Sequence, residues 1–149
     1  MITSKEIELF KTLFQKSPKS IILHINNDSA EIKDIIDNFI NEIDGKLTYK
    51  NFNEINIERF RLTARDFEYV IVSNCLDLVE DIDKFIKEIY HSLENSANII
   101  LIENKLNNNL LFMKDILERN DFRATNSIEI FEEYNLTVAK KMHMWGNGL

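Results

Sequence analysis

The chain has 149 residues, of which 44% are hydrophobic and 29% charged, the composition of an ordinary globular protein with one hydrophobic core. The formal net charge of -7 argues against broad electrostatic attraction to nucleic acid or to an anionic membrane surface. No apolar run approaches the roughly 18 residues of a membrane span, and the N-terminal residues lack the pattern of a secretory signal. The single cysteine cannot form an internal disulfide, so we expect a cytoplasmic protein.

The N-terminal segment, residues 1–17, has the pattern of an amphipathic helix. Thr3 and Glu6 are spaced as a capping box, and Pro18 closes the segment. We expect this helix to cover one end or face of the sheet that the following segments predict.

A strand and a helix are predicted next. Residues 21–25 form a short apolar run that only His24 interrupts, which indicates a central strand. Asp28 is expected to cap the helix 29–43, whose isoleucines recur at helical spacing. Gly45 follows Asp44 and is expected to end this helix in the left-handed conformation.

The segment from Lys46 to Phe52 predicts a second strand. Residues 55–62 favour either a third strand or a short helix. Too few residues remain before Asp66 for a full-length helix flanked by loops, so we expect a shortened crossover.

Residues 67–103 carry the clearest pattern of the chain. An apolar run at 69–72 ends at Ser73, a one-sided helical stripe follows over 82–93, and a second apolar run occupies 99–102. Strand, one-sided helix and strand form a βαβ unit, which implies a parallel sheet with helices on its faces.

The C-terminal part predicts a helix and then a hairpin. Asn108 or Asn109 is expected to cap the helix. The segments Ser127 to Phe131 and Tyr134 to Ala139 are so close in sequence that they must pair antiparallel. The tail, Met142 to Leu149, carries methionine and tryptophan, which favour interfaces. It predicts contact with a protein partner, a homodimer contact, or cover for the chain's own core.

Polar side chains follow two of the predicted strands at their carboxyl ends. Asn26, Asn27 and Asp28 follow the first strand, and Ser73 and Asn74 follow the strand of the central block. Ligands of open α/β sheets bind at such ends, beside a helix N-terminus. These five residues are therefore the candidate pocket, with simple helix capping as the alternative for Asp28.

Other residues that often carry chemistry fit structural roles better here. Cys75 has no histidine that can be assigned as its base, so we expect a small, buried and inert thiol. His24, His91 and His143 share no metal-ligand spacing, so we expect no metal site. His24, within a strand, is expected to be packed and hydrogen-bonded.

The order of these elements resembles that of the class I S-adenosylmethionine-dependent methyltransferases. Asp66 to Val72 is similar to that family's fourth strand, Leu76 to Ile102 to the following helix, turn and fifth strand, and Asn120-Asp121-Phe122 to its Ala-Gly-Phe. The closing hairpin also matches. The resemblance implies a three-layer Rossmann-like α/β fold in one domain over residues 1–149, with a mostly parallel sheet, an antiparallel C-terminal hairpin and a shortened segment between the second and fourth strands.

The chain departs from this family where the family binds its cofactor. The family's D-x-G-x-G-x-G motif is replaced by a turn, Ile25 to Ala30, without glycine, and its L-x-P-G-G turn reads Leu93-Glu94-Asn95-Ser96-Ala97. Glycines let backbone approach the cofactor, and side chains collide with it. The carboxylate that holds the ribose has no assignable counterpart, although Glu54 is the nearest.

These departures predict a degenerate, non-catalytic methyltransferase-like protein that binds a protein partner or a small molecule. No cofactor is predicted for it. The intact order of elements favours an alternative, an active methyltransferase that binds S-adenosylmethionine in a divergent pocket. A third hypothesis is another doubly wound binding domain without a cofactor, because a fold does not determine a function.

Overall fold

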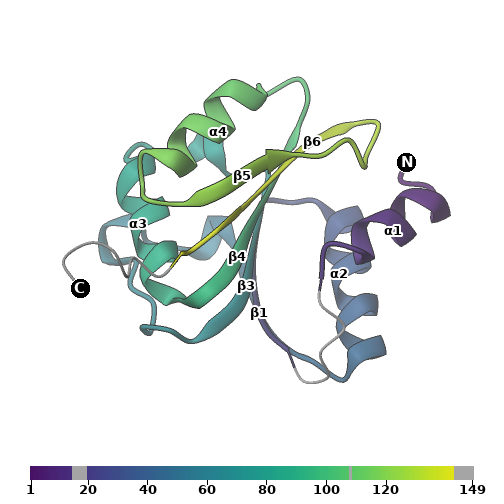
Figure 1. The fold of residues 1–149 in the computed structure, drawn as a ribbon, viewed down its shortest axis with the longest axis horizontal. Helices are drawn as coiled ribbons and strands as arrows, with labels where there is room; N and C mark the ends of the chain where they lie inside the picture. Colours follow the sequence, from purple (N-terminus) through teal and green to yellow (C-terminus); the bar gives the residue numbers. More distant parts are fainter. Residues whose placement is uncertain (15–19, 108, 143–149) are drawn as a thin grey trace.

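The computed structural model describes residues 1–14, 20–107 and 109–142, and its centre is a six-stranded sheet (Figure 1). The strands lie in the order β2-β1-β3-β4-β6-β5. The first four are parallel, and β6 is antiparallel to both β4 and β5. Their bounds are β1 Ile21–Asn26, β2 Lys46–Asn51, β3 Phe67–Ser73, β4 Leu93–Asn104, β5 Arg123–Ser127 and β6 Tyr134–Lys140.

Helices cover both faces of this sheet, which makes three layers (Figure 1). One face packs against α1 and α2, and the other against α3 and α4. The bounds are α1 Ser4–Lys11, α2 Ala30–Ile43, α3 Ile82–Ser92 and α4 Leu110–Glu118. No helix in the described part of the chain is long and apolar enough to span a membrane. The predicted three-layer Rossmann-like fold, with its antiparallel C-terminal hairpin, is confirmed.

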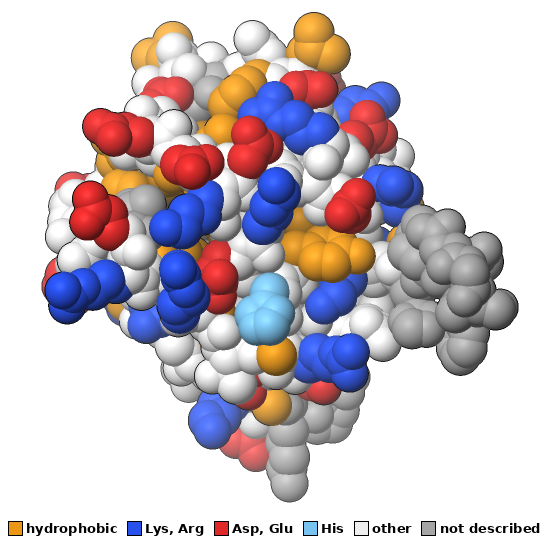
Figure 2. Space-filling model, turned by 90° about the vertical axis from the view of Figure 1, so that its left-hand side faces the viewer, with side chains coloured by type: hydrophobic (Ala, Val, Ile, Leu, Met, Phe, Trp, Pro, Cys, Tyr) orange, Lys and Arg blue, Asp and Glu red, His pale blue; other side chains and the backbone are white. Residues whose placement is uncertain are grey.

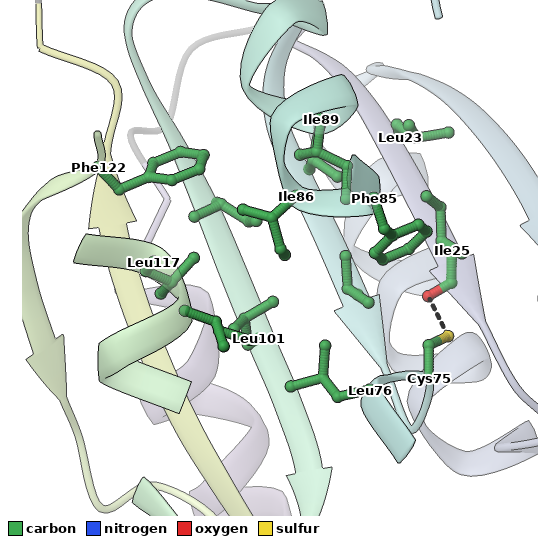
Figure 3. Packing of buried hydrophobic residues seen from close by; sticks show 14 of the residues in the cluster. Leu23, Ile25, Cys75, Leu76, Phe85, Ile86, Ile89, Leu101, Leu117 and Phe122 are labelled. Atoms are coloured by element: carbon green, nitrogen blue, oxygen red, sulfur yellow. Dashed lines mark hydrogen bonds between the residues drawn. The ribbon is translucent and has the colours of Figure 1, made fainter. Parts of the chain in front are cut away.

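Side chains of the central strands alternate between the two cores, as the period of two in a strand requires. In β3, Val70 and Val72 face α3 and α4, whereas Ile71 faces α1 and α2. Ile86 and Ile89 point from α3 onto the sheet (Figure 3). Burial on both faces is typical of parallel strands, and the predicted central block is confirmed.

The segment between β2 and β3 is shortened, as predicted. It forms no strand and no α-helix, only the 3-10 helices η1 (Phe52–Glu54) and η2 (Ile57–Arg59). A third short helix, η3 (Leu76–Leu78), follows β3. Phe60, between η2 and β3, packs its ring on that of Phe85 from α3, with centroids 5.3 Å apart. This stacked pair covers the core that a full crossover helix would otherwise cover.

The predicted N-terminal helix is present but shorter than residues 1–17. The Thr3 hydroxyl accepts from the Glu6 N–H, and the Glu6 carboxylate accepts from the Thr3 N–H, which confirms the capping box. The helix ends at Lys11, and a turn carries the chain to Phe14. Pro18 lies outside the described residues.

Two predicted caps of α2 are wrong. Ser29, not Asp28, is the N-cap, because its hydroxyl accepts from the Ile32 N–H at 3.3 Å. At the other end Asp44, not Gly45, takes the left-handed conformation, with φ 53°. A Cβ on Gly45 would lie 3.0 Å from the Ser20 carbonyl oxygen, so close backbone approach is what favours glycine there.

Two further boundaries differ from the prediction. The segment expected as a turn, Leu93 to Ala97, is the start of β4, directly after α3; its register with β3 shifts there, and Ser96 has a left-handed φ of 69°. The strand expected at Ser127 to Phe131 lies earlier, as β5, because Ile130 and Phe131 leave the sheet to pack beneath α1. Phe131 contacts Phe10 with ring centroids 5.5 Å apart.

Ile71→Ala tests the central strand. The side chain is fully buried, so its removal should lower the free energy of unfolding by roughly 2–5 kcal/mol, as measured by urea denaturation. Leu111→Ala, at a side chain that is 78% exposed on α4, should change it by less than about 0.5 kcal/mol. Equal effects from both substitutions would contradict the assignment of β3.

Ser29→Ala tests the helix cap. Loss of the hydroxyl should cost about 0.5–2 kcal/mol in the same measurement. Asp28→Gly is the matched control, because glycine keeps the left-handed backbone of residue 28 and removes only the exposed carboxylate. A neutral Ser29→Ala, together with a costly Asp28→Gly, would restore Asp28 as the cap.

Candidate functional site

The carboxyl ends of the parallel strands meet at one edge of the sheet, and two candidate residues meet there. Asn26 at the end of β1 is in register with Ser73 at the end of β3. On its other side Asn26 is in register with Asn51, the last residue of β2. Both Asn26 and Ser73 are buried, so the structure brings together one candidate from each strand end.

A chain of hydrogen bonds joins these buried side chains. Ser73 Oγ donates to Asn26 Oδ1 at 2.6 Å, and Ser73 Oγ lies 2.8 Å from His24 Nε2. Asn26 Nδ2 donates to the Ser29 carbonyl at 3.0 Å and to the Tyr49 hydroxyl at 3.2 Å. The amide of Asn26 therefore has partners at both of its ends.

The direction of this chain determines the tautomer of His24. Because the Ser73 proton goes to Asn26, His24 must donate from Nε2 and leave Nδ1 unprotonated. His24 Nδ1 is buried and has no hydrogen-bond partner among the described residues. Burial lowers the pKa of His24 to about 3; the charge of Asp37 raises it by a smaller amount, and that of Lys33 lowers it further. His24 is therefore neutral at physiological pH, and its prediction as a packed, hydrogen-bonded histidine is confirmed.

The other three candidates lie outside this buried chain. The Asn27 N–H donates to the Ser73 carbonyl at 3.0 Å. Asp28 is exposed, and its carboxylate accepts from Asn53 Nδ2 at 3.4 Å. Asn74 has a left-handed backbone, and its side chain accepts from the Asn104 N–H at 3.0 Å. Asn74 thus ties the ends of β3 and β4 together.

Cys75 is buried, as expected. Its Sγ lies 3.8 Å from the Ile25 carbonyl oxygen (Figure 3) and 3.2 Å from the Ser73 carbonyl oxygen. Burial, and next to it the charge of Glu103, raises the pKa of the thiol. The Glu103 carboxylate is itself buried and accepts from the Cys75 N–H at 3.0 Å. Such a thiol is a poor nucleophile.

Sequence reasoning missed Tyr49 and underrated His24 as members of this edge. The position of His24 two residues before Asn26 was an available signal, because such residues share one face of a strand. Among the described residues, no three His, Cys, Asp or Glu side chains are grouped to hold a metal ion.

Five hollows in the described surface are lined by residues other than the candidates Asn26, Asn27, Asp28, Ser73 and Asn74. One, about 340 Å³ in volume, lies at the end of β2 and is lined by residues 49–51, 54–56 and 59–61. We call it the β2 hollow.

The acid stability of the protein tests the state of His24. Its folded pKa lies below the unfolded value of about 6.5, so the unfolded chain takes up a proton first as the pH falls. Stability from this group is complete above about pH 6.5 and is lost on acidification, by about 2 kcal/mol at pH 5. Urea denaturation at pH 7.5 and pH 5 measures this difference.

His24→Gln is the control, because glutamine keeps a donor for Ser73 and does not titrate. The loss between the two pH values should be about 2 kcal/mol smaller in this variant. An unchanged loss would show that the native His24 takes up its proton as readily as the unfolded one.

Solved structures similar to this chain include several methyltransferases. An S-adenosylmethionine-dependent methyltransferase of Aquifex aeolicus has a TM-score of 0.73 at 11% identity, with 91% of this chain and 89% of that chain covered. Phosphoethanolamine N-methyltransferase 2 of Haemonchus contortus, in complex with phosphomonomethylethanolamine and S-adenosylhomocysteine, has a TM-score of 0.71 at 11% identity and covers 93% and 52%. Human N-acetylserotonin methyltransferase, in complex with S-adenosylmethionine, has a TM-score of 0.66 at 14% identity and covers 93% and 52%.

This chain spans about half the length of the last two proteins. No protein-family model matches the sequence, and no curated protein sequence matches it. At such low identity the likeness defines the fold alone. The chain has the fold of the class I S-adenosylmethionine-dependent methyltransferases.

Proposed function

We propose that this chain is a degenerate, non-catalytic member of the methyltransferase fold that acts by binding a partner. The observation that carries this proposal is the buried series of hydrogen bonds from His24 through Ser73 to Asn26. In this fold a glycine-rich turn after the first strand leaves room for the cofactor. Here the side chain of Asn26 occupies part of that space, and both the oxygen and the nitrogen of its amide are hydrogen-bonded.

The end of β2 also fits S-adenosylmethionine poorly. A carboxylate there would hold ribose hydroxyls, but β2 ends at Asn51, whose side-chain oxygen accepts from the Asn53 N–H at 3.1 Å. Glu54, the nearest carboxylate along the sequence, lines the β2 hollow together with Lys50, Arg59 and Arg61. A positive surrounding disfavours a cationic sulfonium.

Exposed leucines support the binding of a partner. Leu106 and Leu111, on either side of the start of α4, are 92% and 78% exposed. Exposed apolar side chains mark an interaction surface where they form a contiguous patch. The buried thiol of Cys75 is compatible with the reducing cytoplasm in which we place the protein.

An active methyltransferase with a divergent pocket is the second candidate. Asp28 favours it, because this exposed carboxylate follows β1 and has, among the described residues, a single long hydrogen bond, from Asn53. A carboxylate at close range attracts the cationic groups of S-adenosylmethionine.

Titration calorimetry with S-adenosylmethionine and S-adenosylhomocysteine distinguishes the two candidates. We expect no heat of binding at high protein concentration, because side chains occupy the turn after β1. A dissociation constant in the micromolar range, about -8 kcal/mol, would overturn the non-catalytic proposal.

In that event Asp28→Asn should weaken binding if the cofactor lies at this turn. Asp44→Asn is the matched control, because Asp44 has the same φ of 53°, is also exposed and lies at the other end of α2.

A further inference from the structure

We infer that the β2 hollow binds a small phosphorylated molecule through Arg59 and Arg61. The hollow lies where β2 ends and the segment with η1 and η2 begins. Tyr49, whose hydroxyl accepts from Asn26, lines the hollow, whereas His24, Ser73 and Asn26 do not. The inference concerns a different ligand from the methyltransferase cofactor and does not depend on the proposed loss of catalysis.

The charges of the hollow favour an anion. Its lining carries the cations Lys50, Arg59 and Arg61 against the single carboxylate of Glu54. Within the described part of the chain, none of these three cations forms an ion pair. This local excess of positive charge stands out in a chain whose formal net charge is -7. Guanidinium groups match phosphate oxygens in geometry as well as in charge.

Neutral side chains in the lining also present donors. The side-chain oxygen of Asn51 accepts from the Asn53 N–H, and that of Asn56 accepts from the Glu58 N–H at 3.1 Å. Because these oxygens are bonded to backbone, the two amide NH2 groups remain to donate to a ligand. Tyr49 accepts from Asn26 through its hydroxyl oxygen, which leaves the phenolic proton to donate as well.

The hollow has the size of a small-molecule site. Its volume of about 340 Å³ lies within the range of ligand pockets, roughly 300–1,000 Å³. Phe60, which lines it, is buried and stacked on Phe85. Aromatic side chains are common in the lining of such pockets.

The hollow over α3 lacks this excess of charge. Its lining holds Arg61, Lys84 and Lys87, but it also holds Asp81, Asp83 and Glu88. The face that includes α3 shows acidic and basic side chains interspersed (Figure 2). The β2 hollow is therefore the better anion site of the two.

Calorimetric titration with inorganic pyrophosphate and with ribose 5-phosphate tests the inference. We expect both probes to bind, and to bind less tightly as salt concentration rises. Ribose is the uncharged comparison and should give no heat. Absence of heat with both anions, or equal affinity for ribose and ribose 5-phosphate, would overturn the inference.

Substitutions locate the binding. Arg59→Gln and Arg61→Gln should each weaken pyrophosphate binding by roughly tenfold, as expected for one charge-assisted hydrogen bond. Arg65→Gln is the matched control, because Arg65 is exposed and belongs to the same segment but does not line the hollow. The Arg65→Gln variant should bind pyrophosphate with the affinity of the unmodified protein. Unchanged affinity in Arg59→Gln and Arg61→Gln, or an equal loss in Arg65→Gln, would refute the site.

The result is independent of the test for S-adenosylmethionine. Binding of pyrophosphate without binding of S-adenosylmethionine would support both proposals. Binding of S-adenosylmethionine alone would overturn both, and binding of each ligand would overturn only the proposed loss of catalysis.

Discussion

Burial of the central parallel strands on both faces is the constraint on which the rest of the structure depends. β1, β3 and β4 carry apolar side chains toward both helical layers, so the middle of each strand is shielded from water on both faces. A polar side chain within them must then find its partner inside the protein. His24, Asn26 and Ser73 meet this demand by bonding to one another across the register of β1 and β3. The hydrogen bonds that satisfy these buried polar side chains therefore also hold them in place at the carboxyl edge of the sheet.

Sequence patterns predicted the elements better than their ends. Apolar runs and one-sided stripes identified β1, β3, α2 and α3, because burial of those side chains is what forms them. Caps depend on single hydrogen bonds, and Asp28 and Ser29 are adjacent residues with equal capping ability, so sequence alone could not choose between them. β5 ends earlier than predicted because of tertiary packing. Phe131 packs against Phe10 beneath α1 instead of continuing an edge strand.

The candidate site was predictable only in part, for a physical reason of the same kind. The rule that ligands bind at strand ends selected Asn26 and Ser73, which do meet. That rule does not say whether two side chains at an edge face a ligand or each other. Tyr49 belongs to β2, and its hydroxyl accepts from Asn26 of β1. No sequence pattern around Tyr49 indicates such a contact. The loss of glycine was the one sequence signal that bore on this choice.

Loss of the glycines and retention of the fold are compatible, because the two have different physical bases. The fold depends on apolar burial, which Ile22, Ile71 and Ile100 provide whatever follows β1. As the family resemblance implies it, cofactor binding depends on bare backbone after β1 and on a carboxylate at the end of β2; here the turn after β1 contains no glycine, and β2 ends at Asn51. In their place it has a neutral, closed polar chain over β1 and β3 and an open, basic hollow beside β2. On the two proposals made above, such an edge would disfavour a cation at its centre and favour an anion at its side, so the ligand class would change while the architecture does not.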